Sequence, residues 1–252
     1  MEYSRVPRFV GHDTVEYGYF PQDKLVDSDN PVCWNEPYYQ DENLLCFFAN
    51  DEQVFFTDGK FYFRCLQGIY EYEPLLWRVF NRKENMLYLI SDRVLFRFPA
   101  SNSDDRFREV YEKEFRERAL LFQNRYLEEV LVDEDGTVSL FSDNDRSNHR
   151  VSSRIFMPSR FECQRMRAKD LCSPSRKPIL KTFQTRFSQD GIPCAEYLGS
   201  PFLLSSKYER DYGRLCFYPS KEGIQDFRMT KNNAGVRPCI IIKEENIIKE
   251  EI

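Results

Sequence analysis

The stretch that decides the fold is Gly235-Val236-Arg237-Pro238-Cys239-Ile240-Ile241-Ile242-Lys243, near the end of the chain. A polar turn from Lys231 to Gly235 precedes it, and the apolar run predicts a strand from Val236 to Lys243. Proline cannot donate to a neighbouring strand, so Pro238 predicts a sheet edge or an unpaired amide side. Arg237 is expected to be structural, its guanidinium donating to backbone carbonyls, with ligand contact as the alternative.

Two hairpins are predicted upstream of this stretch. The dipeptide Asp58-Gly59 separates the aromatic runs Val54-Phe55-Phe56 and Phe61-Tyr62-Phe63, which is a typical two-residue hairpin pattern. A second hairpin consists of two apolar runs and a polar turn: Leu75 to Phe80, Met86 to Ser91, and the turn Asn81 to Asn85. Because side chains alternate across a strand, Trp77 is predicted in the core and Arg78 on the other face, exposed or paired with a carboxylate.

The remaining pattern mixes helices with short strands. Apolar residues at helical spacing predict a helix from about Asp104 to Val130, and the capping box Ser159 to Glu162 opens a second helix to about Leu171. Further strands are predicted at Val15 to Phe20 (closed by Pro21 and followed by a loop from Asp23 to Glu42), Leu44 to Phe48, Thr137 to Phe141, Arg154 to Met157, Arg214 to Tyr218 and Gly223 to Thr230.

These blocks predict an α+β protein, mostly antiparallel β with two main helices. We expect a single domain over 1–252, with a β-rich half at 1–100, a helical segment at 104–132 and a β-rich part at 137–243. A chain of this length can bury a substantial core, and its 15% aromatic content suits one.

Charge and hydropathy bear on the partners and the compartment. With a net charge of -5, the chain lacks the excess of basic residues that drives binding to phosphate backbones. Nucleic acid is therefore not expected as a partner. No apolar run approaches the roughly 20 residues that span a bilayer, so no membrane association is expected. The polar start of the chain lacks an apolar signal core, which favours a cytoplasmic location.

Catalytic chemistry finds little support in the residue pattern. The eight cysteines form no C-x-x-C pair and are expected to be mostly buried and reduced, so neither a metal site nor a cofactor is expected. Only His12 and His149 could act as imidazole bases, and both lie in polar, loop-like sequence. We therefore nominate no catalytic residue.

The order of the motifs resembles a bacterial domain family of unknown function. Its pattern runs from V-x-F-G-x-Y-P-Q through P-I-x-W-R-V-L, L-L-S and F-L-L-S-x-x-E to G-V-R-P. The counterparts here are Val15 to Gln22, Pro74 to Phe80, Leu89 to Ser91, Ile155 to Glu162, and Gly235 to Pro238. The family's W-W-L-R-S-P-G segment corresponds to Tyr197 to Ser206, where the tryptophans and the arginine are replaced. The closing motif also resembles the C-type-lectin-like fold of formylglycine-generating enzymes, a likeness of fold that implies no activity.

These observations predict a non-catalytic recognition module that presents loops on a β-rich scaffold to a partner protein or a glycan. The expected contacts lie in two loops and are Tyr197, Tyr208, Tyr212, Asn232 and Asn233. One alternative is a formylglycine-generating-type oxidoreductase that uses a Cys216/Cys239 pair with copper. Another is a structural or regulatory subunit of a larger bacterial assembly.

Overall fold

A computed structural model describes most of the chain. The described residues are 5–27, 47–49, 52–57, 59–65, 68–97, 107–133, 150–158, 160–172, 202–207, 214–218, 225–228 and 235–249.

The larger sheet contains eight of the described strands, and every pair in it is antiparallel. Its main path is β1 (Arg8–Gly11), β2 (Thr14–Asp27), β6 (Gly68–Lys83), β5 (Lys60–Cys65), β4 (Glu52–Thr57) and β3 (Phe47–Ala49). The other two strands are β7 (Met86–Ser91), which pairs with β6, and β15 (Cys239–Lys243), which pairs with β7. The predicted hairpins β4–β5 and β6–β7 are both confirmed.

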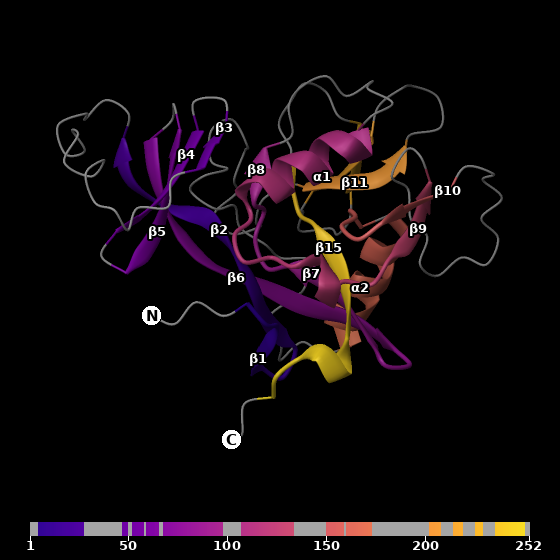
Figure 1. The fold of residues 1–252 in the computed structure, drawn as a ribbon. Coiled ribbons are helices and arrows are strands. Elements are labelled where there is room, and N and C mark those ends of the chain that lie inside the picture. Colours follow the sequence, from indigo (N-terminus) through magenta and orange to yellow (C-terminus); the bar gives the residue numbers. More distant parts are fainter. Residues whose placement is uncertain are drawn as a thin grey trace.

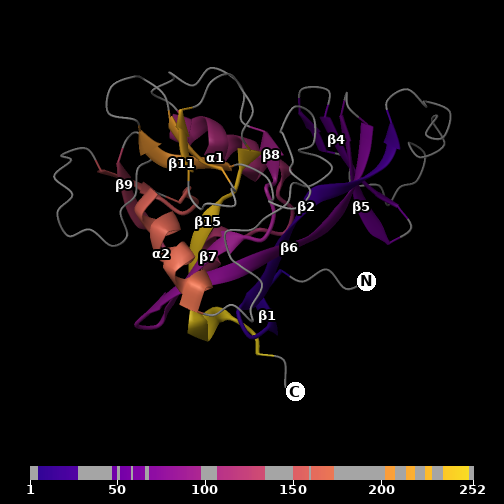
Figure 2. The same cartoon turned by 180° about the vertical axis from the view of Figure 1, so that it is seen from behind.

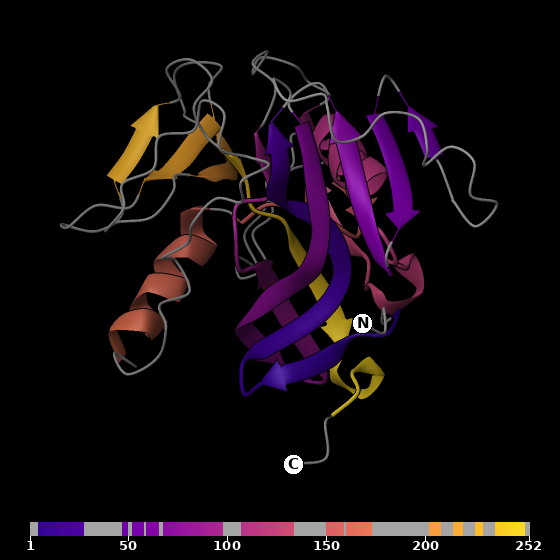
Figure 3. The ribbon, with the colours of Figure 1, turned by 90° about the vertical axis from the view of Figure 1, so that its left-hand side faces the viewer.

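The long strand β6 has two different neighbours along one edge. Residues 68–71 pair with β5, and residues 77–83 pair with β7. Strand β2 follows the other edge of β6 for nearly its whole length, so the two strands curve through the molecule together (Figure 3). Residues 72–76 of β6 pair with neither β5 nor β7, which opens that edge at the bend.

A second sheet of five described strands takes four of them from residues 202–236 and the fifth, β8, from the segment after β7. Its order is β13 (Gln225–Arg228), β12 (Arg214–Tyr218), β11 (Phe202–Lys207), β14 (Gly235–Val236) and β8 (Phe96–Arg97). The contact of β11 with β14 is parallel and the others are antiparallel. Two short strands, β9 (Val130–Asp133) and β10 (Arg150–Ser153), form a separate pair.

Two α-helices, α1 (Phe107–Arg118) and α2 (Arg160–Cys172), lie on opposite faces of the β6–β7–β15 region (Figure 1, Figure 2). Two 3-10 turns, Asn124–Tyr126 and Glu244–Asn246, complete the described elements. Mostly antiparallel sheets with two main helices confirm the expected α+β class.

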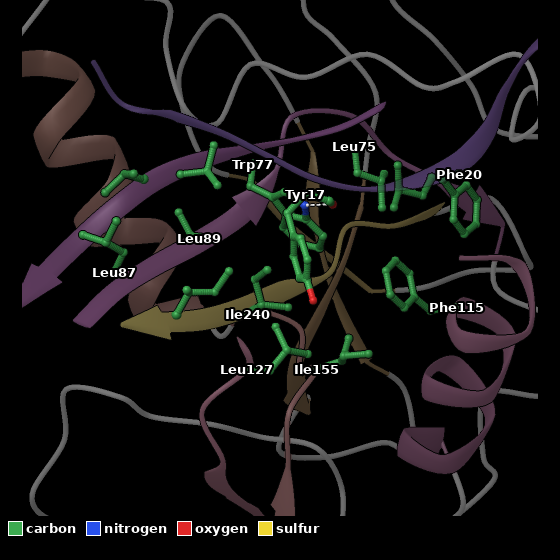
Figure 4. Packing of buried hydrophobic residues seen from close by; sticks show 14 of the residues in the cluster. Tyr17, Phe20, Leu75, Trp77, Leu87, Leu89, Phe115, Leu127, Ile155 and Ile240 are labelled. Atoms are coloured by element: carbon green, nitrogen blue, oxygen red, sulfur yellow. Dashed lines mark hydrogen bonds between the residues drawn. The ribbon is translucent and has the colours of Figure 1, made fainter. Parts of the chain in front are cut away.

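Side-chain alternation gives the two faces of β6, β7 and β15 different characters. On the α1 face, Trp77 is fully buried, and its indole Nε1 donates to the Tyr17 carbonyl at 2.8 Å. Phe115 of α1 stacks on Phe20 and meets Trp77 edge to face. Figure 4 shows this cluster, which also contains Leu75, Val79, Leu87, Leu89, Leu127, Ile155, Ile240 and Ile242. The α2 face carries the intervening residues, among them Arg78, Tyr88 and Cys239.

The predicted continuous strand from Val236 to Lys243 is wrong. Gly235 and Val236 belong to the five-stranded sheet, whereas Cys239–Lys243 belong to the eight-stranded sheet. The chain passes from one sheet to the other at Arg237-Pro238, where proline's missing N–H suits a break in the ladder. The unpaired amide side expected at Pro238 therefore marks a crossing between sheets.

The first strand is also longer than predicted. Strand β2 continues past Pro21 to Asp27 instead of ending there, so residues 23–27 of the expected loop belong to the strand. Register shifts beside Pro21 accommodate the proline, as bulges commonly do.

The long helix predicted to Val130 ends at Arg118. Beyond it, Leu120 exchanges backbone hydrogen bonds of 2.9 Å with Tyr19, and Leu121 has a φ of 53°. Phe122 then packs 4.8 Å from the Tyr17 ring, so aromatic residues at helical spacing belong to an irregular segment on the sheet. The apolar residues after Arg118 are spaced as in a helix because they are buried or partly buried. Their backbone conformation, however, follows from the hydrogen bonds with β2.

The strand predicted at Arg154 to Met157 is displaced to β10, and Phe156 forms an isolated bridge with Cys239. The helix from Arg160 and the strand Arg214–Tyr218 are confirmed. Strand β3, at Phe47–Ala49, overlaps the end of the strand predicted at Leu44 to Phe48. Residues 44–46 and the strand predicted at Thr137 to Phe141 lie outside the described residues.

Gly18 allows the segment after α1 to approach β2. It has a φ of 75°, and a Cβ there would lie 2.8 Å from Phe122 Cδ2. Replacing Gly18 with alanine is expected to lower the free energy of unfolding by about 2 kcal/mol or more, from backbone strain plus the clash. Gly59→Ala is the matched control, because Gly59 also has a φ of 75° but no neighbour within 4 Å. Urea unfolding of both variants measures the difference, and equal losses would show that Phe122 does not press on Gly18.

Candidate functional site

The site begins at the turn that follows β7. Ser91 Oγ donates to the Arg93 carbonyl at 2.8 Å, which closes a local turn typical of serine. The Asp92 amide donates to the Leu76 carbonyl at 2.7 Å, on the stretch of β6 that pairs with neither β5 nor β7. The Leu95 amide donates to Val236 at 3.0 Å, which ties the same segment to β14. The turn is therefore fixed between both large sheets.

A pocket of about 80 Å³ lies between this turn and the bend of β6. Its lining combines an apolar base with four polar side chains: Gln22, Glu73, Pro74, Leu75, Leu76, Asp92, Arg93 and Leu95. It occupies the opening left where β6 exchanges β5 for β7.

Gln22 is a positioned side chain in this pocket. The register shift between Pro21 and Asp23 makes Gln22 the extra residue of a bulge, and it is only 4% exposed. Its Nε2 donates to the carbonyls of Glu73 and Pro74 at 3.2 and 3.1 Å. Bulges often re-aim a side chain in this way.

The charged side chains of the pocket make two ion pairs, one at the exposed rim and one deeper in the protein. At the rim, Arg93 Nη1 and Glu73 Oε2 are 4.0 Å apart, and the Arg93 side chain is 50% exposed. Deeper, Asp92 Oδ1 lies 3.6 Å from Arg78 Nη1.

Behind the turn, Arg237 is fully buried and donates from Nε to the Ser91 carbonyl at 2.6 Å. Burial lowers the pKa of Arg237 to about 10, and the carboxylate of Asp92 opposes that shift. The guanidinium thus supports the turn that carries Asp92 and Arg93.

Two thiols are buried beside Arg237. Cys239 and Cys163 of α2 are both fully buried and reduced. Burial raises the pKa of the Cys239 thiol well above its ordinary value, and Glu162 raises it further, whereas Arg237 lowers it. Thiols react as thiolates, so this environment makes Cys239 unreactive.

The structure does not place the expected cysteine pair on neighbouring strands. Cys216 lies in β12 of the five-stranded sheet, opposite Leu203 and Phe227, and Cys239 lies in β15 of the other sheet, opposite Ile90. The thiol whose charge influences Cys239 is Cys163.

The five residues expected to bind a partner, Tyr197, Tyr208, Tyr212, Asn232 and Asn233, lie outside the described residues, as does His149. His12 is exposed on the β1–β2 turn, with Nδ1 at 3.3 Å from Asp13. Sequence reasoning missed the pocket because its lining comes from three separated segments. The one local signal was the pair of prolines beside Gln22 and Glu73, which mark irregular strands.

Within the described part of the chain, no three His, Cys, Asp or Glu side chains gather to hold a metal ion. No helix among the described residues is long and apolar enough to cross a membrane. Comparison with protein-family models, curated proteins and solved structures found no match for this chain.

Replacing Arg237 with lysine is expected to reduce the free energy of unfolding by about 2–4 kcal/mol. The charge stays buried, but the compact ammonium of lysine loses the fixed Nε donor to Ser91. Arg82→Lys is the control, because Arg82 makes partly exposed ion pairs with Asp13 and Glu244 that contribute under about 1 kcal/mol. Chemical denaturation compares the two, and a loss at Arg237 no larger than at Arg82 would contradict this role.

Cys163 and Cys239 are expected to resist alkylation by iodoacetamide at pH 8 in the folded protein. Their modification should be about a hundredfold or more slower than that of Cys65, which is partly exposed, since it requires local opening. Peptide-resolved mass spectrometry measures each rate, and in urea the three rates should converge. Rapid native labelling of Cys239 would mean that its thiol is accessible.

Proposed function

We propose that this chain is a non-catalytic recognition module that binds a partner protein through the pocket between β6 and the turn after β7. The observation that carries the proposal is the size of this pocket. Sites for whole small molecules usually enclose about 300–1,000 Å³, and this one has about 80 Å³. That volume suits the end of one side chain.

The construction of the pocket supports recognition. Its polar side chains stand on paired strands and on a turn held by backbone hydrogen bonds, so little ordering is needed on binding. Leu76 lines the pocket and is 38% exposed, which offers an apolar contact beside the polar groups.

A partner protein fits better than a glycan because none of the lining residues is aromatic, and a sugar ring commonly packs on an aromatic face. Tyr197, Tyr208, Tyr212, Asn232 and Asn233, which the sequence predicts to lie in loops, are proposed as further contacts to the same partner. The proposed module has a C-type-lectin-like fold, belongs to the bacterial family that its motifs resemble, and acts in the cytoplasm.

The buried thiol favours this proposal over a formylglycine-type oxidoreductase. Copper binding and thiol oxidation need an accessible thiolate, whereas Cys239 is fully buried with a raised pKa. The other alternative, a subunit of a larger assembly, differs from this proposal only in that the partner protein stays bound permanently.

A photo-crosslinking amino acid in place of Leu76 tests the proposal. In the natural host, illumination should give one discrete protein adduct from this position and none from the same amino acid in place of exposed Lys249. Adding Glu73→Lys should abolish the adduct, because it reverses a charge on the pocket lining. Identical adducts from both positions, or none from position 76, would overturn the proposal.

A further inference from the structure

We infer that the pocket selects a cationic side chain of the partner, arginine before lysine. The inference rests on the proposed function and adds the chemistry of the group that enters. It follows from the hydrogen-bonding capacity of the lining, the placement of the charges and the apolar base.

The buried amide of Gln22 offers an acceptor. Its Nε2 group has two N–H donors, and the carbonyls of Glu73 and Pro74 take hydrogen bonds from that nitrogen. The amide orientation is thereby set with the nitrogen toward β6. What Gln22 can add for a ligand is its carbonyl oxygen, which accepts hydrogen bonds.

The two carboxylates extend the same preference. Glu73 and Asp92 line the pocket, and an ionised carboxylate only accepts, with about four lone-pair sites shared by its two oxygens. The Glu73 side chain is 37% exposed, so an incoming group reaches its carboxylate first, whereas Asp92 lies deeper and already faces Arg78. Three of the four polar side chains in the lining thus favour a donor.

Arg93 is the one cation among the lining residues, and its ion pair with Glu73 is weak. Its closest approach to Glu73 is 4.0 Å, and half of its side chain is exposed, where an ion pair adds little. A ligand cation that reaches Glu73 directly can replace this contact while Arg93 turns outward to water.

The carboxylates of the lining favour a guanidinium over an ammonium group. Carboxylates bind the planar guanidinium with two parallel hydrogen bonds, which an ammonium cannot match. Leu75, Leu76 and Leu95 in the lining give the methylene stem of the entering side chain an apolar contact. The net charge of -5 also favours approach of a basic surface over distance.

Titration with N-acetyl-arginine amide, followed by NMR, tests the preference on the full chain. The backbone amides of Asp92 and Arg93 and the side-chain amide of Gln22 should shift, with a Kd of about 1–10 mM. The citrulline analogue has nearly the same shape without the charge and should bind about tenfold more weakly. N-acetyl-glutamate amide should leave these signals in place, and tighter binding of glutamate than of arginine would overturn the inference.

Three variants locate the selectivity. Glu73→Gln should weaken the arginine probe about 3–10-fold, while the matched change Glu71→Gln, at a residue that pairs with Lys60 outside the pocket, should leave it unchanged. Arg93→Gln should hold or strengthen the binding of arginine, because it removes a competing cation. Loss of arginine binding in Arg93→Gln would overturn the inference even if Glu73→Gln were too unstable to test.

The two proposals fail separately. Equal shifts with the arginine and glutamate probes, together with an intact adduct from position 76, would reject cation selection and keep protein recognition. Absence of the adduct would reject protein recognition whatever the probes do.

Discussion

The hydrogen bond from Arg237 to Ser91 is the constraint on which most of this structure depends. Arg237 Nε donates to the Ser91 carbonyl at 2.6 Å, and the Ser91 amide donates to the Pro238 carbonyl at 3.0 Å. These two bonds join the end of β7 to the point where the chain leaves the five-stranded sheet for the other. A buried guanidinium loses its hydration, which costs several kcal/mol, so its hydrogen bond and the nearby Asp92 must offset that loss. The crossing is therefore held in one geometry.

The two faces of the β6–β7–β15 region differ in character, because side chains alternate across each strand. The face toward α1 is filled by Trp77, Phe115 and aliphatic neighbours, and Tyr17 joins it by exchanging hydrogen bonds with the backbone of Gln123. Burial raises the pKa of Tyr17 well above its ordinary value, so the hydroxyl stays neutral. On the side toward α2, the Arg237 guanidinium and the Cys239 thiol are buried close to Cys163 and Glu162 of that helix. The apolar face supplies the packing, and the polar face fixes the position of the turn that carries Asp92.

The pocket forms where the long strand β6 changes its neighbour from β5 to β7. A strand that changes neighbours leaves a short unpaired edge, and buried backbone groups there must find other partners. Here the Asp92 amide, from the turn after β7, donates to the Leu76 carbonyl, and the Gln22 side chain of β2 donates to the carbonyls of Glu73 and Pro74. The groups that complete the backbone hydrogen bonding are thus the groups that line the pocket. The pocket is therefore held rigid by the hydrogen bonds of the sheet and the turn, and needs no further supporting element.

The sequence by itself determined the local elements. The Asp58-Gly59 hairpin, the hairpin of β6 and β7, the helix from Arg160 and the strand Arg214–Tyr218 all follow from turn chemistry, capping and alternation, which act within a few residues. Only the tertiary structure decided that β2 continues past Pro21, that the helical pattern after Arg118 becomes an irregular segment, and that Arg237-Pro238 separates two sheets. In each case a distant backbone supplied the hydrogen bonds: β6 for Pro21, Tyr19 for Leu120, Ser91 for Arg237. The pocket belongs to this second group, because Gln22, Glu73 and Asp92 meet only when β2, β6 and the turn after β7 are paired.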